Sequence, residues 1–139
     1  MKLRFSAMIG LAAAAGAISF SSLPAKEAPS AKSAQKLATA LQGRTAGQPT
    51  NCVPNLHGQV KMNVIDDGTI LFRDGSTVYL QRPAGGCPGL ESRGYTLVSR
   101  RVGQHQICQG DIQELVDLQT GIQGGSCVFS EFVPYRKAM

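Results

Sequence analysis

The chain has 139 residues, which is enough for one domain and too few for two separate hydrophobic cores. Its 14 basic and 9 acidic residues give a formal net charge of +5, and it contains no tryptophan. The basic clusters, Arg100–Arg101 and Arg136–Lys137, are not interleaved with aromatic side chains. Nucleic-acid binding therefore has no support beyond net charge, whereas a mildly basic surface fits loose contact with anionic polymers.

Residues 1–25 have the pattern of a secretory signal peptide. Lys2 and Arg4 form a short positive region, and the uncharged stretch FSAMIGLAAAAGAISF that follows is shorter than the ~20 residues of a membrane span. We predict cleavage after Ala25, with residues 15–17 as a second candidate site; an uncleaved membrane anchor is the alternative. After cleavage we expect no membrane span, and we expect a periplasmic or secreted bacterial protein.

Residues 26–50 are rich in Ala, Ser, Lys and Gln, and we treat them as a leader to the main domain. Within them, Ser30 can cap a short helix and Gly43 can terminate it. The apolar stripe of this helix is thin, so a helix packed on the domain and a disordered leader both remain open. The stripe would consist of Ala34, Leu37 and Leu41.

Residues 51–136 form the main domain, and their hydrophobic pattern is that of β-strands. Residues 58–82 contain three alternating stretches separated by the turn signals Asp66-Asp67-Gly68 and Asp74-Gly75, which predicts a three-stranded meander. The glycine- and proline-rich stretch RPAGGCPG then predicts a loop that carries Cys87.

The second half of the domain continues with short strands. The segment DIQELVDL fits a helix through Ile112, Leu115 and Val116, or a strand whose inner face holds Ile112, Glu114, Val116 and Leu118. We favour the strand, because turn residues and a final strand, SCVFSEFVP, follow it. Six or seven short strands with regular turn signals predict a mainly β fold, a small antiparallel barrel or sandwich.

Four cysteines, Cys52, Cys87, Cys108 and Cys127, predict two disulfide bonds in an exported chain of this length. A four-cysteine zinc site is the rival interpretation, but such sites use closely spaced pairs and the sequence has no C-x-x-C. Four cysteines allow three pairings. We predict Cys87–Cys108, which closes a short loop, and Cys52–Cys127, which ties the ends of the domain together.

The stretch HQICQGDI places His105, Cys108 and Asp111 close together and so raises the possibility of a thiol nucleophile. Alternation along a strand would put His105 and Cys108 on opposite faces, and the turn at Gly110 explains Asp111 as an acceptor of backbone hydrogen bonds. Asp66 and Asp67 have the same explanation. His57 and His105 lack metal-ligand spacing, so we expect no metal site, no cofactor and no catalytic residues.

Two places are candidate binding sites. Tyr135 and Arg136, in FVPYRK, would lie at the rim of the domain, where such residues favour recognition; the alternative is that Tyr135 closes the core. Leu90 and Glu91 end the loop PAGGCPGL, which is the candidate for insertion into the cleft of another protein.

Four cysteine-centred motifs together carry a family resemblance: RTAGQPTNC, IDDGTILFRDGSTVYLQRPAGGCPGL, ICQGDIQELVD and GSCVFSEFVPYR. Over residues 44–136 the chain resembles a family of small exported alphaproteobacterial proteins, a domain of unknown function. The resemblance implies a secreted single-domain protein and supplies no catalytic residues. Ser130, in FSEF, departs from the glycine of the family pattern and affects local turn geometry only.

The sequence leads to two functional hypotheses of different classes. The first is a binding or interaction module for an envelope protein or an anionic polymer. The second is an inhibitor of a hydrolase of the lysozyme or protease type, a role that rests on fold-level analogy. Enzymatic activity is not expected, because every catalytic template fails on spacing.

Overall fold

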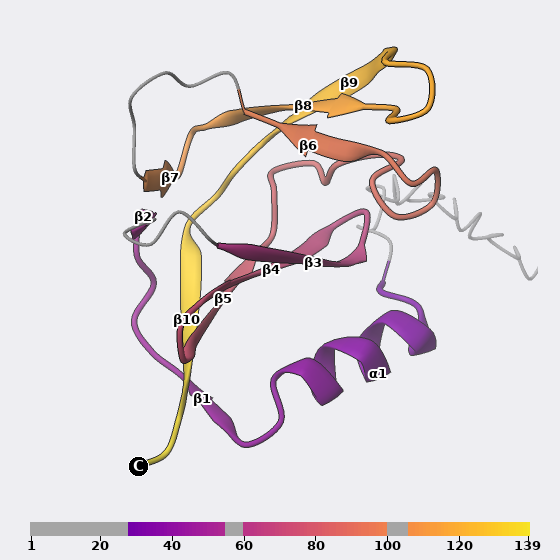
Figure 1. Cartoon of the computed structure of the whole chain (residues 1–139). Helices are drawn as coiled ribbons and strands as arrows, with labels where there is room; N and C mark the ends of the chain where they lie inside the picture. The colour runs from indigo at the N-terminus through magenta and orange to yellow at the C-terminus, as the bar shows by residue number, and fades with distance from the viewer. Residues whose placement is uncertain (1–27, 55–59, 100–105) are drawn as a thin grey trace, which may run out of the picture.

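A computed structural model describes residues 28–54, 60–99 and 106–139 (Figure 1). The predicted signal peptide, His57 and His105 lie outside these ranges. The described part of the chain forms one helix and ten strands, arranged in three antiparallel sheets. The predicted β fold is therefore confirmed; the sheets form an open sandwich and close no barrel. The strands exceed the predicted six or seven for two reasons. Arg44–Ala46 and Cys52–Pro54 are three-residue strands, too short to show alternation, and the prediction of one final strand, SCVFSEFVP, is wrong because the chain there forms two strands, Gln123–Val128 and Phe132–Lys137, in different sheets.

The largest sheet has five strands in the order β1-β10-β5-β4-β3. The predicted meander forms one side of this sheet, from the edge strand β3 to the central strand β5, and its consecutive strands are joined by the two predicted turns. Gly75, in the second turn, has a φ of 58°, a conformation that side chains rarely adopt. The strands are β1 (Arg44–Ala46), β3 (Lys61–Asp66), β4 (Thr69–Asp74), β5 (Thr77–Gln81) and β10 (Phe132–Lys137).

Two smaller sheets lie on one side of the large one. The segment that was ambiguous between helix and strand is β8, at the centre of a three-stranded sheet with the order β6-β8-β9, so the prediction of a strand is confirmed. A two-stranded sheet joins β2 to β7. The strands are β2 (Cys52–Pro54), β6 (Thr96–Val98), β7 (Gln106–Cys108), β8 (Ile112–Val116) and β9 (Gln123–Val128).

The main hydrophobic core lies between the three-stranded and five-stranded sheets. Phe72, Phe129 and Phe132 pack edge to face at its centre, with ring centroids 5.5 to 6.0 Å apart. Gln81 is fully buried beside them: its amide donates to the Ser130 carbonyl at 2.8 Å, and its oxygen accepts from the Ser130 amide at 2.9 Å. These bonds hold the segment in which the chain crosses from β9 to β10.

The helix α1 (Ala31–Ala40) covers the opposite face of the five-stranded sheet (Figure 1). Ser30 caps it as predicted, because its hydroxyl accepts from the Ser33 amide at 3.1 Å. Of the two alternatives for this segment, the packed helix is the one that forms in the described residues 28–50, and β1 continues them into the sheet. A second core cluster lies under the helix, where Leu37, Ala40 and Leu41 pack against Ile65, Leu71, Val78 and Leu80.

All four cysteines form disulfides, as predicted, but the predicted pairing is wrong. The bonds join Cys52 to Cys108 and Cys87 to Cys127. Cys52 and Cys108 are direct cross-strand partners of β2 and β7, with Cα atoms 4.0 Å apart. Cys127 faces the main core from β9 and there meets the loop that carries Cys87. The pairing follows strand neighbours and not separation along the chain.

Candidate functional site

The HQICQGDI stretch is a structural junction. Cys108 is in a disulfide, so it offers no thiol. The Cys108 amide donates to Asp111 Oδ2 at 2.8 Å, and the Asp111 amide returns a bond to the Cys108 carbonyl at 3.1 Å. Asp111 is 1% exposed. Its predicted role as an acceptor of backbone hydrogen bonds is therefore confirmed, and the thiol nucleophile has no structural basis here.

Asp67 fixes the loop that carries Leu90 and Glu91. Its carboxylate accepts from the backbone amides of Gly89 (3.0 Å), Glu91 (2.7 Å) and Ser92 (3.1 Å), and also from the Ser92 hydroxyl (2.8 Å). Burial of the Asp67 carboxyl raises its pKa, but these hydrogen bonds outweigh burial and hold the pKa below its usual value. The turn explanation given for both aspartates is confirmed for Asp66, which accepts from the Gly68 amide at 2.9 Å; Asp67 reaches a distant loop instead.

The side chains of the two predicted binding residues of this loop, Leu90 and Glu91, differ in exposure. Leu90 is 2% exposed and packs in the main core, so its side chain cannot enter the cleft of another protein while the fold is intact. Glu91 is exposed, and only its backbone amide is engaged by Asp67. Of the pair, Glu91 alone has an exposed side chain.

Tyr135 and Arg136 lie on β10, beside β1. Tyr135 is partly buried against the second core cluster, opposite Val78 of β5, which supports the alternative that it closes the core. Arg136 is exposed and lies opposite Thr45 of β1. Leu90 belongs to the main core, on the other side of the five-stranded sheet, so the two candidate binding sites are separate places on the molecule.

The outer face of the three-stranded sheet carries exposed apolar residues around Glu114, and the sequence pattern did not reveal them. Ile112 is 63% exposed and lies directly opposite Val128, which is 39% exposed. Val98, on the other side of β8, is 37% exposed. The direct partner of Val98 on β8 is Glu114, which lies between Ile112 and the partly buried Val116 on the same face. We call Val98, Ile112, Val116 and Val128 the apolar face.

The predicted orientation of β8 is therefore wrong. We expected Ile112, Glu114, Val116 and Leu118 to point inward, but Gln113 and Leu115 are the buried residues of the strand. Apolar side chains occur on both faces of β8, and this made alternation ambiguous. The hairpin tip beyond it adds two more exposed apolar residues, Leu118 (76%) and Ile122 (67%).

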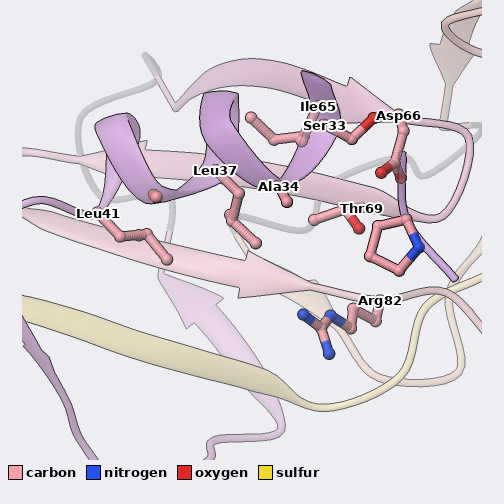
Figure 2. A pocket seen from close by; sticks show the side chains of 10 residues that line it. Ser33, Ala34, Leu37, Leu41, Ile65, Asp66, Thr69 and Arg82 are labelled. Carbon is pink, nitrogen blue, oxygen red and sulfur yellow. The ribbon is translucent and has the colours of Figure 1, made fainter. Parts of the chain in front are cut away.

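A groove separates α1 from the five-stranded sheet, with a volume of about 280 Å³ (Figure 2). We call it the α1 groove. Its walls are apolar: Figure 2 shows Leu37 and Leu41 pointing toward the sheet at one end. Polar side chains, Asp66, Thr69 and Arg82, lie at the other end. Ala34, Ala38 and Ile65 also line it.

No protein-family model matches the chain, and neither a curated protein nor a solved structure shows significant similarity to it. The fold of the described residues defines a general class: a small, disulfide-bonded, open β-sandwich with a helix packed outside it. The described part of the chain contains no helix with the length and apolar character needed to cross a membrane. Two disulfides are typical of an oxidising, extracytoplasmic compartment.

Proposed function

We propose that this chain is an exported binding module that engages a protein of the bacterial periplasm or cell exterior through the apolar face. The signal-peptide pattern of residues 1–25 supports export, and the two disulfides fit the compartment that export reaches. The partner is a folded protein with an apolar patch of its own.

The observation that carries this proposal is the exposure of Ile112 opposite Val128. Contiguous apolar patches on a protein surface mark interaction sites, whereas scattered apolar residues need no explanation. Here the apolar residues come from three adjacent strands: Ile112 lies directly opposite Val128, and Val98 and Val116 lie on the same face around Glu114. Full burial of one such side chain against a partner contributes roughly 1.5–3 kcal/mol, before the cost of association.

The strands that carry the apolar face are also held rigidly by the main core. Leu115 and Cys127 pack into the main core from the buried side of β8 and β9, and Cys127 is held by its disulfide. A surface whose geometry is fixed before binding loses little conformational entropy when it docks. This favours recognition of one partner.

The proposal is tested with Ile112→Lys and Val128→Lys, compared with Met62→Lys. Met62 of β3 is 39% exposed, as Val128 is, but lies on the five-stranded sheet. Wild-type protein and the three variants are used as bait in an envelope extract, and captured proteins are quantified. We expect one protein to be captured by wild type and Met62→Lys and lost with the other two variants. Equal capture by all four, or no specific capture by wild type, would refute the proposal.

A second candidate, inhibition of a hydrolase, is favoured by the loop held by Asp67. Four hydrogen bonds to one carboxylate fix the backbone around the exposed Glu91, as a loop inserted into an active site requires. If this candidate is correct, Glu91→Ala abolishes inhibition of a lysozyme or protease without changing the melting temperature. Inhibition that survives this substitution would exclude Glu91 as the inserted residue.

A further inference from the structure

The α1 groove is a cavity left by incomplete packing of the helix. No residue of α1 is fully buried, although Leu37, Ala40 and Leu41 touch the second core cluster. The groove volume of about 280 Å³ is close to the lower limit, roughly 300 Å³, of pockets that bind small molecules. Its walls offer water few hydrogen-bond partners, so an apolar group would displace water from it favourably.

The polar end of the α1 groove contains a positively charged side chain, Arg82. Among the residues that the structure describes, the exposed Arg82 side chain makes no hydrogen bond and no ion pair. Asp66 lies at the same end without pairing to Arg82, and its Oδ1 accepts from the Gly68 amide at 2.9 Å. The guanidinium is therefore the group at this end that is available to a negatively charged ligand.

The neighbouring surface under α1 is also positive. Lys61 of β3 and Arg73 of β4 are direct cross-strand partners, and both line a smaller pocket that Ala40 borders. Like charges directly opposite each other on a sheet destabilise it. By the register of β4 and β5, this pair lies at the opposite end of the sheet from Arg82. The carboxylate of a ligand that is apolar along its length therefore has Arg82 as its partner at the polar end of the α1 groove.

We propose that the α1 groove binds a free single-chain fatty acid, with the acyl chain along Leu37 and Leu41 and the carboxylate on Arg82. The groove and the apolar face lie on opposite sides of the five-stranded sheet. This inference is therefore independent of the proposed protein partner, and either can fail without the other.

The experiment is calorimetric titration of the purified, disulfide-intact protein with laurate below its critical micelle concentration. We expect saturable binding at one site. Arg82→Gln should weaken the affinity at least tenfold, whereas Arg136→Gln, which removes the same charge from β10, should leave it unchanged. Ala38→Trp places a bulky side chain at an exposed groove position and should abolish binding while circular dichroism stays unchanged.

Four results would overturn the inference. They are no saturable binding of laurate by wild type, equal affinity in Arg82→Gln, equal affinity in a folded Ala38→Trp, and equal affinity for dodecyltrimethylammonium, which has the same chain and the opposite charge. A titration with phosphatidylglycerol vesicles distinguishes a membrane surface from a free fatty acid. Binding of vesicles with no binding of laurate is the first of these four results, with a membrane surface as the ligand.

Discussion

The Asp67 carboxylate accepts two hydrogen bonds from Ser92, one from its backbone amide at 3.1 Å and one from its hydroxyl at 2.8 Å. Asp67 lies in the turn between β3 and β4, and Ser92 lies 25 residues further along the chain. The Asp67 carbonyl also accepts from the Cys87 amide at 2.6 Å. One turn residue thus ties the large sheet to the disulfide-bearing loop.

Asp67→Asn should destabilise the protein at neutral pH. The asparagine amide cannot accept all four hydrogen bonds, and the expected loss is about 1–3 kcal/mol. The pKa of Asp67 is lowered in the folded state, so the stability it contributes is present above the unfolded pKa and is lost as the pH falls through the folded pKa. Urea unfolding at pH 7 and pH 3 should show a larger acid-induced loss in wild type than in the variant. Equal losses would contradict this role.

Removal of the Cys87–Cys127 disulfide should cost more stability than removal of Cys52–Cys108. The two close loops of similar size, with sequence separations of 40 and 56, and chain entropy alone assigns about 4 kcal/mol to each. Cys87 and Cys127 are buried in the core, however, at 0% and 4% exposure, so their loss also disturbs packing.

The measurement is urea unfolding of the two double Cys→Ala variants. Peptide mapping without reduction is the accompanying control, and it should recover the pairs Cys52–Cys108 and Cys87–Cys127. Recovery of a Cys87–Cys108 peptide would contradict the structure. If the Cys87→Ala/Cys127→Ala variant is more stable than the Cys52→Ala/Cys108→Ala variant, the predicted order of their stabilities is wrong.

Gln81→Glu should introduce a pH-dependent defect. At neutral pH the buried carboxylate cannot donate to the Ser130 carbonyl, and the expected loss of unfolding free energy is about 3 kcal/mol. Protonation of the introduced carboxylate restores a donor, so the deficit relative to wild type should shrink at pH 4. Melting curves at the two pH values test this. Gln81→Leu is the control, and its loss of stability relative to wild type should not depend on pH. If the losses of the two variants change equally between the two pH values, protonation of the introduced carboxylate is not the cause.

The features that could be predicted from the sequence are those that depend on interactions between residues close together in the chain. Ser30 caps α1 because its hydroxyl reaches an amide three residues away, and Asp74-Gly75 joins β4 to β5 because glycine accepts a positive φ. Both interactions are encoded within a few residues. For the same reason Asp111 could be assigned to its turn from its neighbours alone.

Features that depend on distant neighbours were missed. Cys52 pairs with Cys108 because β2 and β7 are adjacent, and nothing near either cysteine indicates this. The orientation of β8 depends on which of Ile112 and Leu115 meets the large sheet, and both are apolar. The α1 groove arises from imperfect packing between elements, so no sequence pattern marks it.

Binding of a protein by the apolar face can be measured by site-specific photo-cross-linking in the cells that make this protein. p-Benzoylphenylalanine at position 112 keeps the site apolar and places the reactive group on the face; position 62, on the large sheet, is the control. We expect one discrete cross-linked adduct from position 112 and none from position 62. No adduct from position 112, or the same adduct from both positions, would contradict it.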